Sequence, residues 1–115
     1  MYTLAQRVAW ETRRDVSYAA IGASYVALGG PIIQPVRMLK IVNTTDVTID
    51  ISDDGTHDKD IITSGSAFIY DFTSNAASNA GSIFTAAKGT QIYIKGDPSS
   101  GSVYMIVIYA APIGG

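Results

Sequence analysis

Apolar and polar positions alternate along most of the chain in short runs. The runs are rich in Val, Ile and Tyr, and clusters of Gly, Asp, Ser, Asn and Pro separate them. This combination is typical of β-strands joined by turns. The runs predict strands at residues 16–28, 36–42, 47–52, 61–62, 67–72, 82–87, 91–95 and 102–110.

The spacing of the turns indicates how these strands are organised. Turn signals recur at intervals of about ten residues, which favours an antiparallel sandwich or barrel over alternating strands and helices. We therefore predict an all-β fold, a single antiparallel β-sandwich of jelly-roll-like type over residues 15–115. Residues 1–14 are predicted to form an N-terminal arm or a short helix. An immunoglobulin-like strand order is an alternative, because periodicity does not reveal which strands pair.

The residue patterns of two predicted strands indicate which of their side chains face the core. In residues 47–52, Val47, Ile49 and Ile51 alternate with polar residues and should face the core. The strand at residues 102–110 is apolar on both faces, which is typical of a strand covered on both sides or pressed against another chain. One of its faces carries Val103, Met105, Val107 and Tyr109, and the other carries Tyr104, Ile106 and Ile108.

Composition narrows the possible functions. The 115 residues fit one domain, and with no cysteine the chain has no disulfides, thiolate metal sites or cysteine nucleophiles. Eight basic and ten acidic residues give a formal net charge of −2, so we expect no nucleic-acid partner. No apolar stretch approaches the roughly 20 residues of a membrane span, and the N-terminus lacks a signal-peptide pattern. We therefore expect that the protein has no membrane partner and that it is assembled in a cytoplasm.

Residues 50–60 form the most polar stretch and suggest a cation site. Asp50, Asp54 and Asp58 are the candidate ligands, and Gly55 follows in the manner of a calcium-binding loop. The twelfth position of such a loop is here Ile61, where a bidentate glutamate is required. A hairpin tip with a positive φ at Gly55 explains the same residues without an ion. The turn is the favoured interpretation, and a hard-cation site is the alternative.

Catalytic chemistry has little support in the sequence. His57 is the only histidine, and the serines that could act as nucleophiles, such as Ser64 and Ser99, belong to unrelated turns. We therefore predict a protein that is not an enzyme and needs no cofactor, with a small-molecule ligand disfavoured. The strand tyrosines leave a carbohydrate-binding module as an alternative function, because tyrosine can stack on sugar rings. These tyrosines are Tyr70, Tyr93, Tyr104 and Tyr109.

A family resemblance begins in the first half of the chain. Residues 36–55 contain an Arg-apolar-apolar strand, an Asn-x-Thr-Asp turn, an apolar strand ending in Ser, and an Asp-Gly tip. In this order they resemble small β-sandwich structural proteins of tailed bacteriophage particles. Residues 68–75, 89–96 and 100–109 continue the likeness. It lies in the residue patterns of the strands and turns and includes no chemical motif. Residues 1–15 have no counterpart in it.

The resemblance implies a non-enzymatic component of a virion, placed in the collar at the head-to-tail junction or on the capsid as a decoration protein. It implies association with copies of the same chain and with other virion proteins. We expect residues 1–14 to be the arm that reaches a neighbouring subunit, since large aromatics such as Tyr2 and Trp10 dominate interface energetics. The predicted interface residues are Tyr2, Leu4, Val8, Trp10, Tyr104, Ile106 and Ile108.

Overall fold

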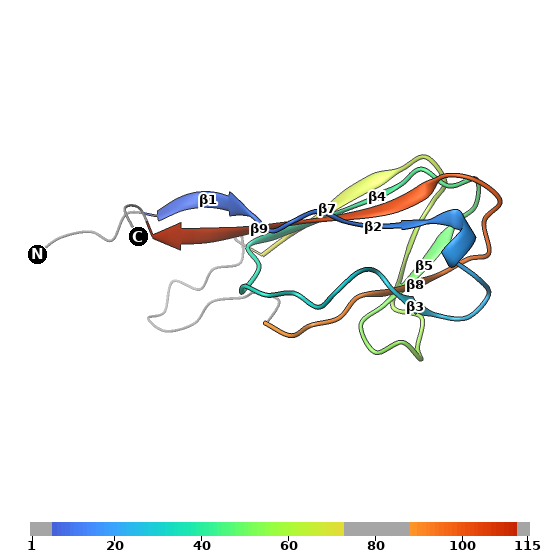
Figure 1. Cartoon of the computed structure of the whole chain (residues 1–115), viewed down its shortest axis with the longest axis horizontal. Helices are drawn as coiled ribbons and strands as arrows, with labels where there is room; N and C mark the ends of the chain where they lie inside the picture. Colours follow the sequence, from blue (N-terminus) through green and yellow to red (C-terminus); the bar gives the residue numbers. More distant parts are fainter. Residues whose placement is uncertain (1–5, 73–87, 113–115) are drawn as a thin grey trace, which may run out of the picture.

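The computed structural model describes residues 6–72 and 88–112, and these residues form two antiparallel sheets packed face to face (Figure 1). A single turn of 3₁₀ helix, η1, spans Tyr18–Ala20. The strands are β1 (Gln6–Trp10), β2 (Arg14–Ser17), β3 (Val26–Ala27), β4 (Met38–Asn43), β5 (Ile49–Ser52), β6 (Asp60–Ile62), β7 (Ala67–Asp71), β8 (Tyr93–Lys95) and β9 (Ser102–Pro112).

Strand pairing follows a nested pattern. Sheet A has the order β1-β9-β4-β7, and β2 also pairs with β9; sheet B has the order β3-β8-β5-β6. The pairs β2·β9, β3·β8, β4·β7 and β5·β6 are therefore those of one long hairpin that has been rolled up into two sheets. This is the jelly-roll arrangement, and it confirms the predicted antiparallel β-sandwich. It also decides against the immunoglobulin-like alternative.

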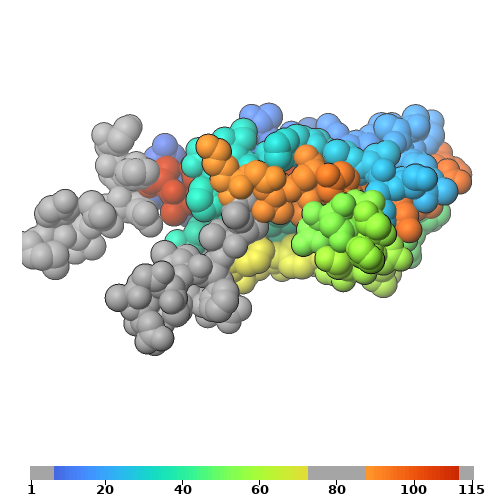
Figure 2. Space-filling model, turned by 90° about the horizontal axis from the view of Figure 1, so that it is seen from below, coloured from blue at the N-terminus to red at the C-terminus, as the bar shows by residue number. Residues whose placement is uncertain are grey.

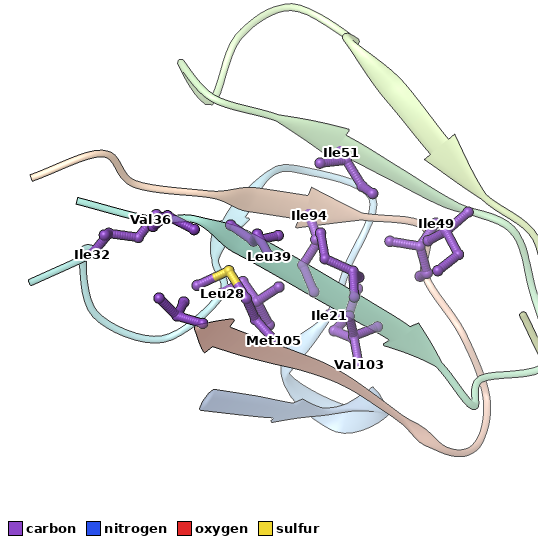
Figure 3. Close-up of a cluster of buried hydrophobic side chains, with 13 residues drawn as sticks. Ile21, Leu28, Ile32, Val36, Leu39, Ile49, Ile51, Ile94, Val103 and Met105 are labelled. Atoms are coloured by element: carbon purple, nitrogen blue, oxygen red, sulfur yellow. The ribbon is translucent and has the colours of Figure 1, made fainter. Parts of the chain in front are cut away.

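The core lies between the two sheets and consists mainly of isoleucine, valine and leucine side chains (Figure 3). Ile49 and Ile51 of β5 are buried as predicted, and Val47 packs against the same cluster. From sheet A, β9 contributes Val103, Met105 and Val107, all fully buried. Burying an aliphatic side chain of this size stabilises the fold by about 1.5–3 kcal/mol, so this layer supplies much of the folding free energy.

One buried polar side chain joins the edges of the two sheets. Asn43, at the end of β4, is fully buried, and its amide nitrogen donates to the carbonyls of Val47, Ile62 and Thr63 at 3.0–3.2 Å. Its amide oxygen accepts hydrogen bonds from the backbone N–H and the hydroxyl of Thr45. Every polar atom of the side chain thus has a partner, which is the condition for burying an amide without a net penalty.

The prediction of one continuous strand over residues 16–28 is wrong. The chain passes there from sheet A to sheet B, and it does so through the 3₁₀ turn η1 between β2 and β3. Ser17 caps this turn, since its hydroxyl accepts a hydrogen bond from the N–H of Ala19. A local side-chain bond of this kind competes with the ladder and ends the strand.

Residues Gln6–Trp10 are a strand, so the helical alternative for the N-terminal segment is wrong for these residues. Their ladder partner is the C-terminal end of β9, with Val8 opposite Ala110 and Trp10 opposite Ile108. Residues 1–5 and the predicted strand at 82–87 lie outside the described residues. In Figure 1, β1 and the end of β9 form a two-stranded ribbon, here called the β1–β9 ribbon, that extends beyond the sandwich body.

A buried ion pair fixes the junction between the ribbon and the body. Glu11 Oε1 lies 2.8 Å from Arg14 Nη2, and both side chains are almost fully buried. Glu11 Oε2 accepts hydrogen bonds from the N–H groups of Ile33 and Gln34, and Arg14 donates to the carbonyls of Gly30 and Pro31. These bonds satisfy both charges, so the link between β1 and β2 is anchored to the loop before β4. In the part of the chain that the structure describes, no helix is long and apolar enough to cross a bilayer.

Candidate functional site

The face of sheet A that points away from the core is the most unusual surface of the molecule. Along β9 the odd-numbered residues face the core, whereas Tyr104, Ile106 and Ile108 lie on the opposite face and are half-buried. Both sides of this strand are therefore apolar, and its own sandwich covers only one of them. We call the side away from the core the outer face of sheet A.

Neighbouring strands extend this outer face with further apolar side chains. Ile108 lies between Trp10 of β1 and Met38 of β4, and Ile106 lies opposite Lys40, which in turn lies opposite Ile69 of β7. By strand register, the apolar residues on this face are Val8, Trp10, Met38, Val42, Ala67, Ile69, Tyr104, Ile106, Ile108 and Ala110.

Exposure of these side chains is high for residues of their size. Val8 is 59% exposed, Trp10 is 62% exposed and Ile69 is 56% exposed. Single exposed apolar residues are ordinary, but a contiguous group across four strands marks an interaction surface. Charged residues also lie on this face. Lys40 occupies its middle, Asp71 lies opposite Met38, and Asp15 lies opposite Tyr104. The guanidinium of Arg13 stacks 5.2 Å from the centre of the Tyr104 ring.

A shallow hollow of about 270 Å³ lies at the base of the β1–β9 ribbon. It is lined by Val8, Met38 and Ile108 from the outer face together with Arg7, Arg37, Tyr109 and Ala110. Within the described residues, Arg37 Nε is buried without a hydrogen-bond partner. The hollow thus offers apolar area, with two arginines among its lining residues.

Five of the seven predicted interface residues meet on the outer face of sheet A. Val8 and Trp10 reach it from β1, and Tyr104, Ile106 and Ile108 reach it from β9. The other two, Tyr2 and Leu4, lie outside the described residues. Sequence reasoning missed Met38 and Ile69, which belong to alternating strands whose second apolar face shows only once the pairing partners are known.

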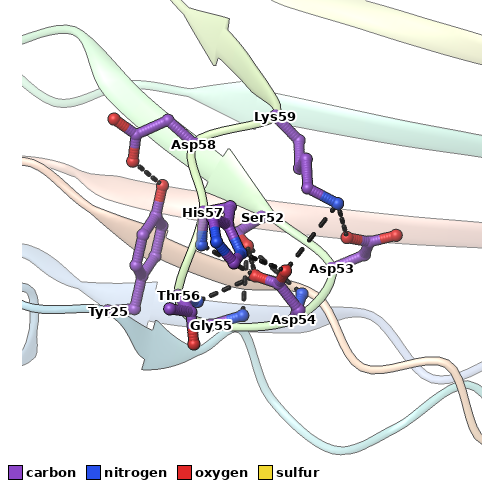
Figure 4. A network of polar contacts seen from close by, with 9 residues as sticks. All are labelled: Tyr25, Ser52, Asp53, Asp54, Gly55, Thr56, His57, Asp58 and Lys59. Carbon is purple, nitrogen blue, oxygen red and sulfur yellow. Dashed lines mark hydrogen bonds and ion pairs between the residues drawn. The ribbon is translucent and has the colours of Figure 1, made fainter.

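The acidic turn after β5 is held by its own side chains (Figure 4). Asp54 Oδ1 accepts hydrogen bonds from the backbone N–H groups of Thr56 and His57 and from the hydroxyl of Ser52 at 2.7 Å. The other carboxylate oxygen, Oδ2, lies 2.8 Å from His57 Nδ1. The N–H of His57 is the largest of the causes that hold the pKa of Asp54 well below its usual range. Gly55 has φ of +76°, which confirms the predicted hairpin tip.

The three aspartates named as candidate cation ligands have separate surroundings. Asp58 accepts a 2.5 Å hydrogen bond from the Tyr25 hydroxyl and pairs with Lys95 Nζ at 3.2 Å. The Tyr25 bond is the largest cause of the lowered pKa of Asp58. Asp50 lies in β5 opposite Lys95. Within residues 6–72 and 88–112, no group of three acidic or histidine side chains converges as metal ligands would.

The turn stands out from the surface as a rounded projection (green in Figure 2). His57 is 73% exposed there, with Asp54 as its side-chain partner. Ser64 donates to the carbonyl of Thr45, and the N–H of Ser99 donates to Asp46, so neither serine is placed beside the histidine. The geometry of the described residues therefore assembles a turn rather than a nucleophile, a base and an orienting group.

The strand tyrosines do not share one surface. Tyr70 packs its ring edge against Phe68 and donates its hydroxyl to Asp60, and burial is the main cause that raises its pKa. Tyr93 packs beside Gly55, and Tyr104 lies under Arg13 on the outer face. Tyr109 lines the hollow at the ribbon base.

A second hollow, of about 330 Å³, lies between the sheet edges where β5 and β7 approach each other. Its lining is mainly apolar, with Leu39, Ile51 and Phe72 among the residues and with Asp53, Lys59 and Asp60 also contributing. It adjoins Phe72, after which the described chain resumes only at Lys88. Its apolar wall consists of core residues and residues packed against the core, and its rim carries the charged residues.

Comparison with known proteins gives one structural likeness. No family model and no curated protein matches the chain. A solved structure described under the words "Bacillus endospore appendages form a novel family of disulfide-linked pili" is similar, with a TM-score of 0.48 and 14% identity over 91% of this chain and 89% of that chain. A likeness at this level carries no function to this chain, which contains no cysteine.

Proposed function

We propose that the protein is a non-enzymatic structural subunit that associates with copies of itself through the outer face of sheet A. The observation that supports this most is the second apolar face of β9, where Tyr104, Ile106 and Ile108 lie beside the exposed Trp10 of β1. A surface of this kind lowers the free energy of the chain when another protein covers it.

The particle to which the subunit belongs is proposed to be a tailed-phage virion, at the collar or on the capsid surface. The supporting observations are the residue pattern of the strands and turns in residues 36–55 and the jelly-roll architecture, which is common in capsid proteins. In such a particle, other virion proteins would contact the acidic turn or the rest of the surface. The proposed role needs no cofactor and no small-molecule ligand.

Self-association is tested by placing a charge on the outer face. In Ile106→Glu the new carboxylate lies opposite Lys40, so the sandwich should fold as before while the apolar face is interrupted. Ile61→Glu is the control, because Ile61 is an exposed isoleucine that lies on β6 of sheet B, away from the outer face of sheet A. Sedimentation velocity should show weaker association for Ile106→Glu and the wild-type association for Ile61→Glu. Equal association of both variants would contradict the proposed surface.

The virion assignment is tested separately on particles. Phage released from cells that encode the chain are purified by density gradient, and their proteins are identified by peptide mass spectrometry. The proposal expects peptides of this chain in the particle fraction at a stoichiometry similar to that of collar or decoration proteins. Intact particles that lack these peptides would contradict it.

A further inference from the structure

Strand β1 ends sheet A with an edge whose backbone groups have no ladder partner. Glu11 donates its N–H to the carbonyl of Val107 at 3.0 Å, and antiparallel pairs alternate between those that exchange hydrogen bonds and those that do not. In the β1–β9 register, the backbone groups of Ala9 therefore point at β9, whereas those of Val8 and Trp10 point away from it. Among the described residues, nothing bonds to these outward groups.

Proteins usually prevent unwanted pairing of an edge strand by an outward charge, a proline or a covering loop. Among the described residues, β1 contains no proline and no strand or loop pairs with its outer edge. The residues with outward backbone groups, Val8 and Trp10, are both apolar and both highly exposed. The charged residues Arg7 and Glu11 point their side chains to the opposite face of the ribbon. An unprotected apolar edge of this kind is a template for a further strand.

We propose that β1 pairs antiparallel with β1 of a second copy of the chain, about a two-fold axis that passes beside Ala9. This inference rests on the proposed self-association and adds a second contact to it, because the edge pairing leaves the outer faces of both copies open to a further contact. Val8 then lies opposite Trp10 of the partner subunit, and Trp10 lies opposite Val8 of the partner subunit. The two copies of sheet A become one continuous sheet.

The register follows from the direction of the backbone groups. Outward-pointing residues must face outward-pointing residues, and pairing Val8 with Trp10 of the partner subunit satisfies this on both sides of the axis. It also forms two aromatic–β-branched cross-strand pairs, which are among the stabilising combinations. A strand that matches itself in this way gives a closed two-fold dimer and no open fibre. In this arrangement the outer faces of both copies lie on the same side.

The direction of β1 decides where the body of the partner subunit lies. β1 runs toward the sandwich body from Gln6 at the tip of the ribbon (Figure 1). In an antiparallel pair the partner's body lies beyond that tip. A second copy therefore fits the edge, with its body at the far end of the ribbon.

The first test removes one outward N–H and leaves the ladder to β9 intact. Val8→Pro lacks this donor, and a proline is tolerated where the N–H of an edge strand faces solvent. We expect the dissociation constant to rise at least about tenfold, because two intersubunit hydrogen bonds are lost per dimer. Val8→Thr keeps the N–H and the β-branched shape and should associate much more like wild type. Urea unfolding of both variants checks that the sandwich is folded.

The second test determines the register by cysteine cross-linking. The chain has no cysteine, so single substitutions report one position each. In Ala9→Cys the two sulfurs would meet beside the axis, where Cα atoms of such pairs are about 4.5 Å apart. Ala9→Cys should form a disulfide-linked dimer on mild oxidation, and Val8→Cys should do so much less. Preferential linkage of Val8→Cys would overturn the proposed register.

These outcomes separate the edge contact from the proposed function. Wild-type association of Val8→Pro together with no cross-link in Ala9→Cys would overturn the β1 pairing. If Ile106→Glu still dissociates in the same experiments, self-association through the outer face stands. A wild-type chain that does not associate at all would overturn both.

Discussion

Gly101 occupies a position that no other residue can fill without moving the chain. Its φ is +87°, and a Cβ at this residue would lie 2.2 Å from the carbonyl oxygen of Thr44. The close approach lets the turn before β9 lie against the end of β4. The conformational requirement and the steric requirement therefore fall on the same residue, where only glycine meets both.

Gly101→Ala should lower the free energy of unfolding by more than about 3 kcal/mol, since strain at positive φ and a backbone clash add together. Gly65→Ala is the matched control, because Gly65 also has positive φ but has open space around its Cβ position. The control should cost about 1 kcal/mol. Urea denaturation of both variants measures the difference, and equal losses would show that the contact with Thr44 is not as close as described.

Asn43 should be the most sensitive polar residue of the core. Asn43→Ala removes one donor from the carbonyls of Val47, Ile62 and Thr63 and removes the side-chain acceptor of the Thr45 N–H. It should cost about 2–4 kcal/mol of unfolding free energy. Thr44→Ala removes an exposed hydroxyl that donates to Ser102 and should cost at most about 1 kcal/mol. Chemical denaturation distinguishes the two. A loss at Asn43 no larger than that at Thr44 would contradict the described network.

The acidic turn predicts a loss of stability in acid. The pKa of Asp54 is lower in the folded chain than its value of about 3.9 in an unfolded one. The hydrogen bonds to its carboxylate thus stabilise the folded state above pH 4, and this contribution is lost as the pH falls below about 4. Urea midpoints between pH 6 and pH 2.5 should fall less steeply for Asp54→Asn than for wild type. Asp53→Asn, whose carboxylate pairs with Lys59, is the control and should keep the wild-type slope.

At the scale of the element, the two faces of β9 should differ in their tolerance of a charge, because the sandwich covers only one of them. Val107→Glu would bury a charge between the sheets and should prevent stable folding, because an unpaired buried charge costs several kcal/mol. Ile106→Glu, one residue earlier, should change the unfolding free energy by about 1 kcal/mol or less. Circular dichroism and urea unfolding give the comparison. A folded Val107→Glu would mean that the faces of β9 are assigned the wrong way round.

Strand alternation was enough to predict the core positions of Ile49 and Ile51, and the two apolar faces of β9 were visible in the sequence. The break after Ser17 was not visible in the sequence. It arises because the chain crosses from one sheet to the other there, and the apolar content of residues 16–28 is equally typical of one continuous strand. The strand at Gln6–Trp10 was equally hidden. Its spacing of Leu4 and Val8 fits a helix, and only the free edge of β9 makes it a strand.

The outer face could be predicted only in part for a related reason. Residues on β1 and β9 were recognised from their own apolar character. Met38 joins them through the register of β4 with β9, and Ile69 joins them through the register of β7 with β4; no local pattern contains this information. The acidic turn could be predicted from its sequence, because Asp54 and Gly55 form their hydrogen bonds with residues close to them in the chain. Local chemistry is read directly from sequence, and contacts between distant strands are not.

At the scale of the whole molecule, the sandwich closes its core on one side of sheet A and leaves the other side apolar. The β1–β9 ribbon carries this outer face beyond the body, where Trp10 and Val8 are accessible to another chain. A small domain can present more apolar area in this way than its own core can cover. The central claim is that other protein molecules, first of all copies of the same chain, cover it.

The mass of the full chain in solution tests this claim most directly. Sedimentation velocity from micromolar to near-millimolar concentration should show the mass rising from that of the 12.2 kDa monomer toward a defined multiple. Under the same conditions Ile106→Glu should remain closer to the monomer. A wild-type chain that stays at 12.2 kDa over the whole range would contradict the account.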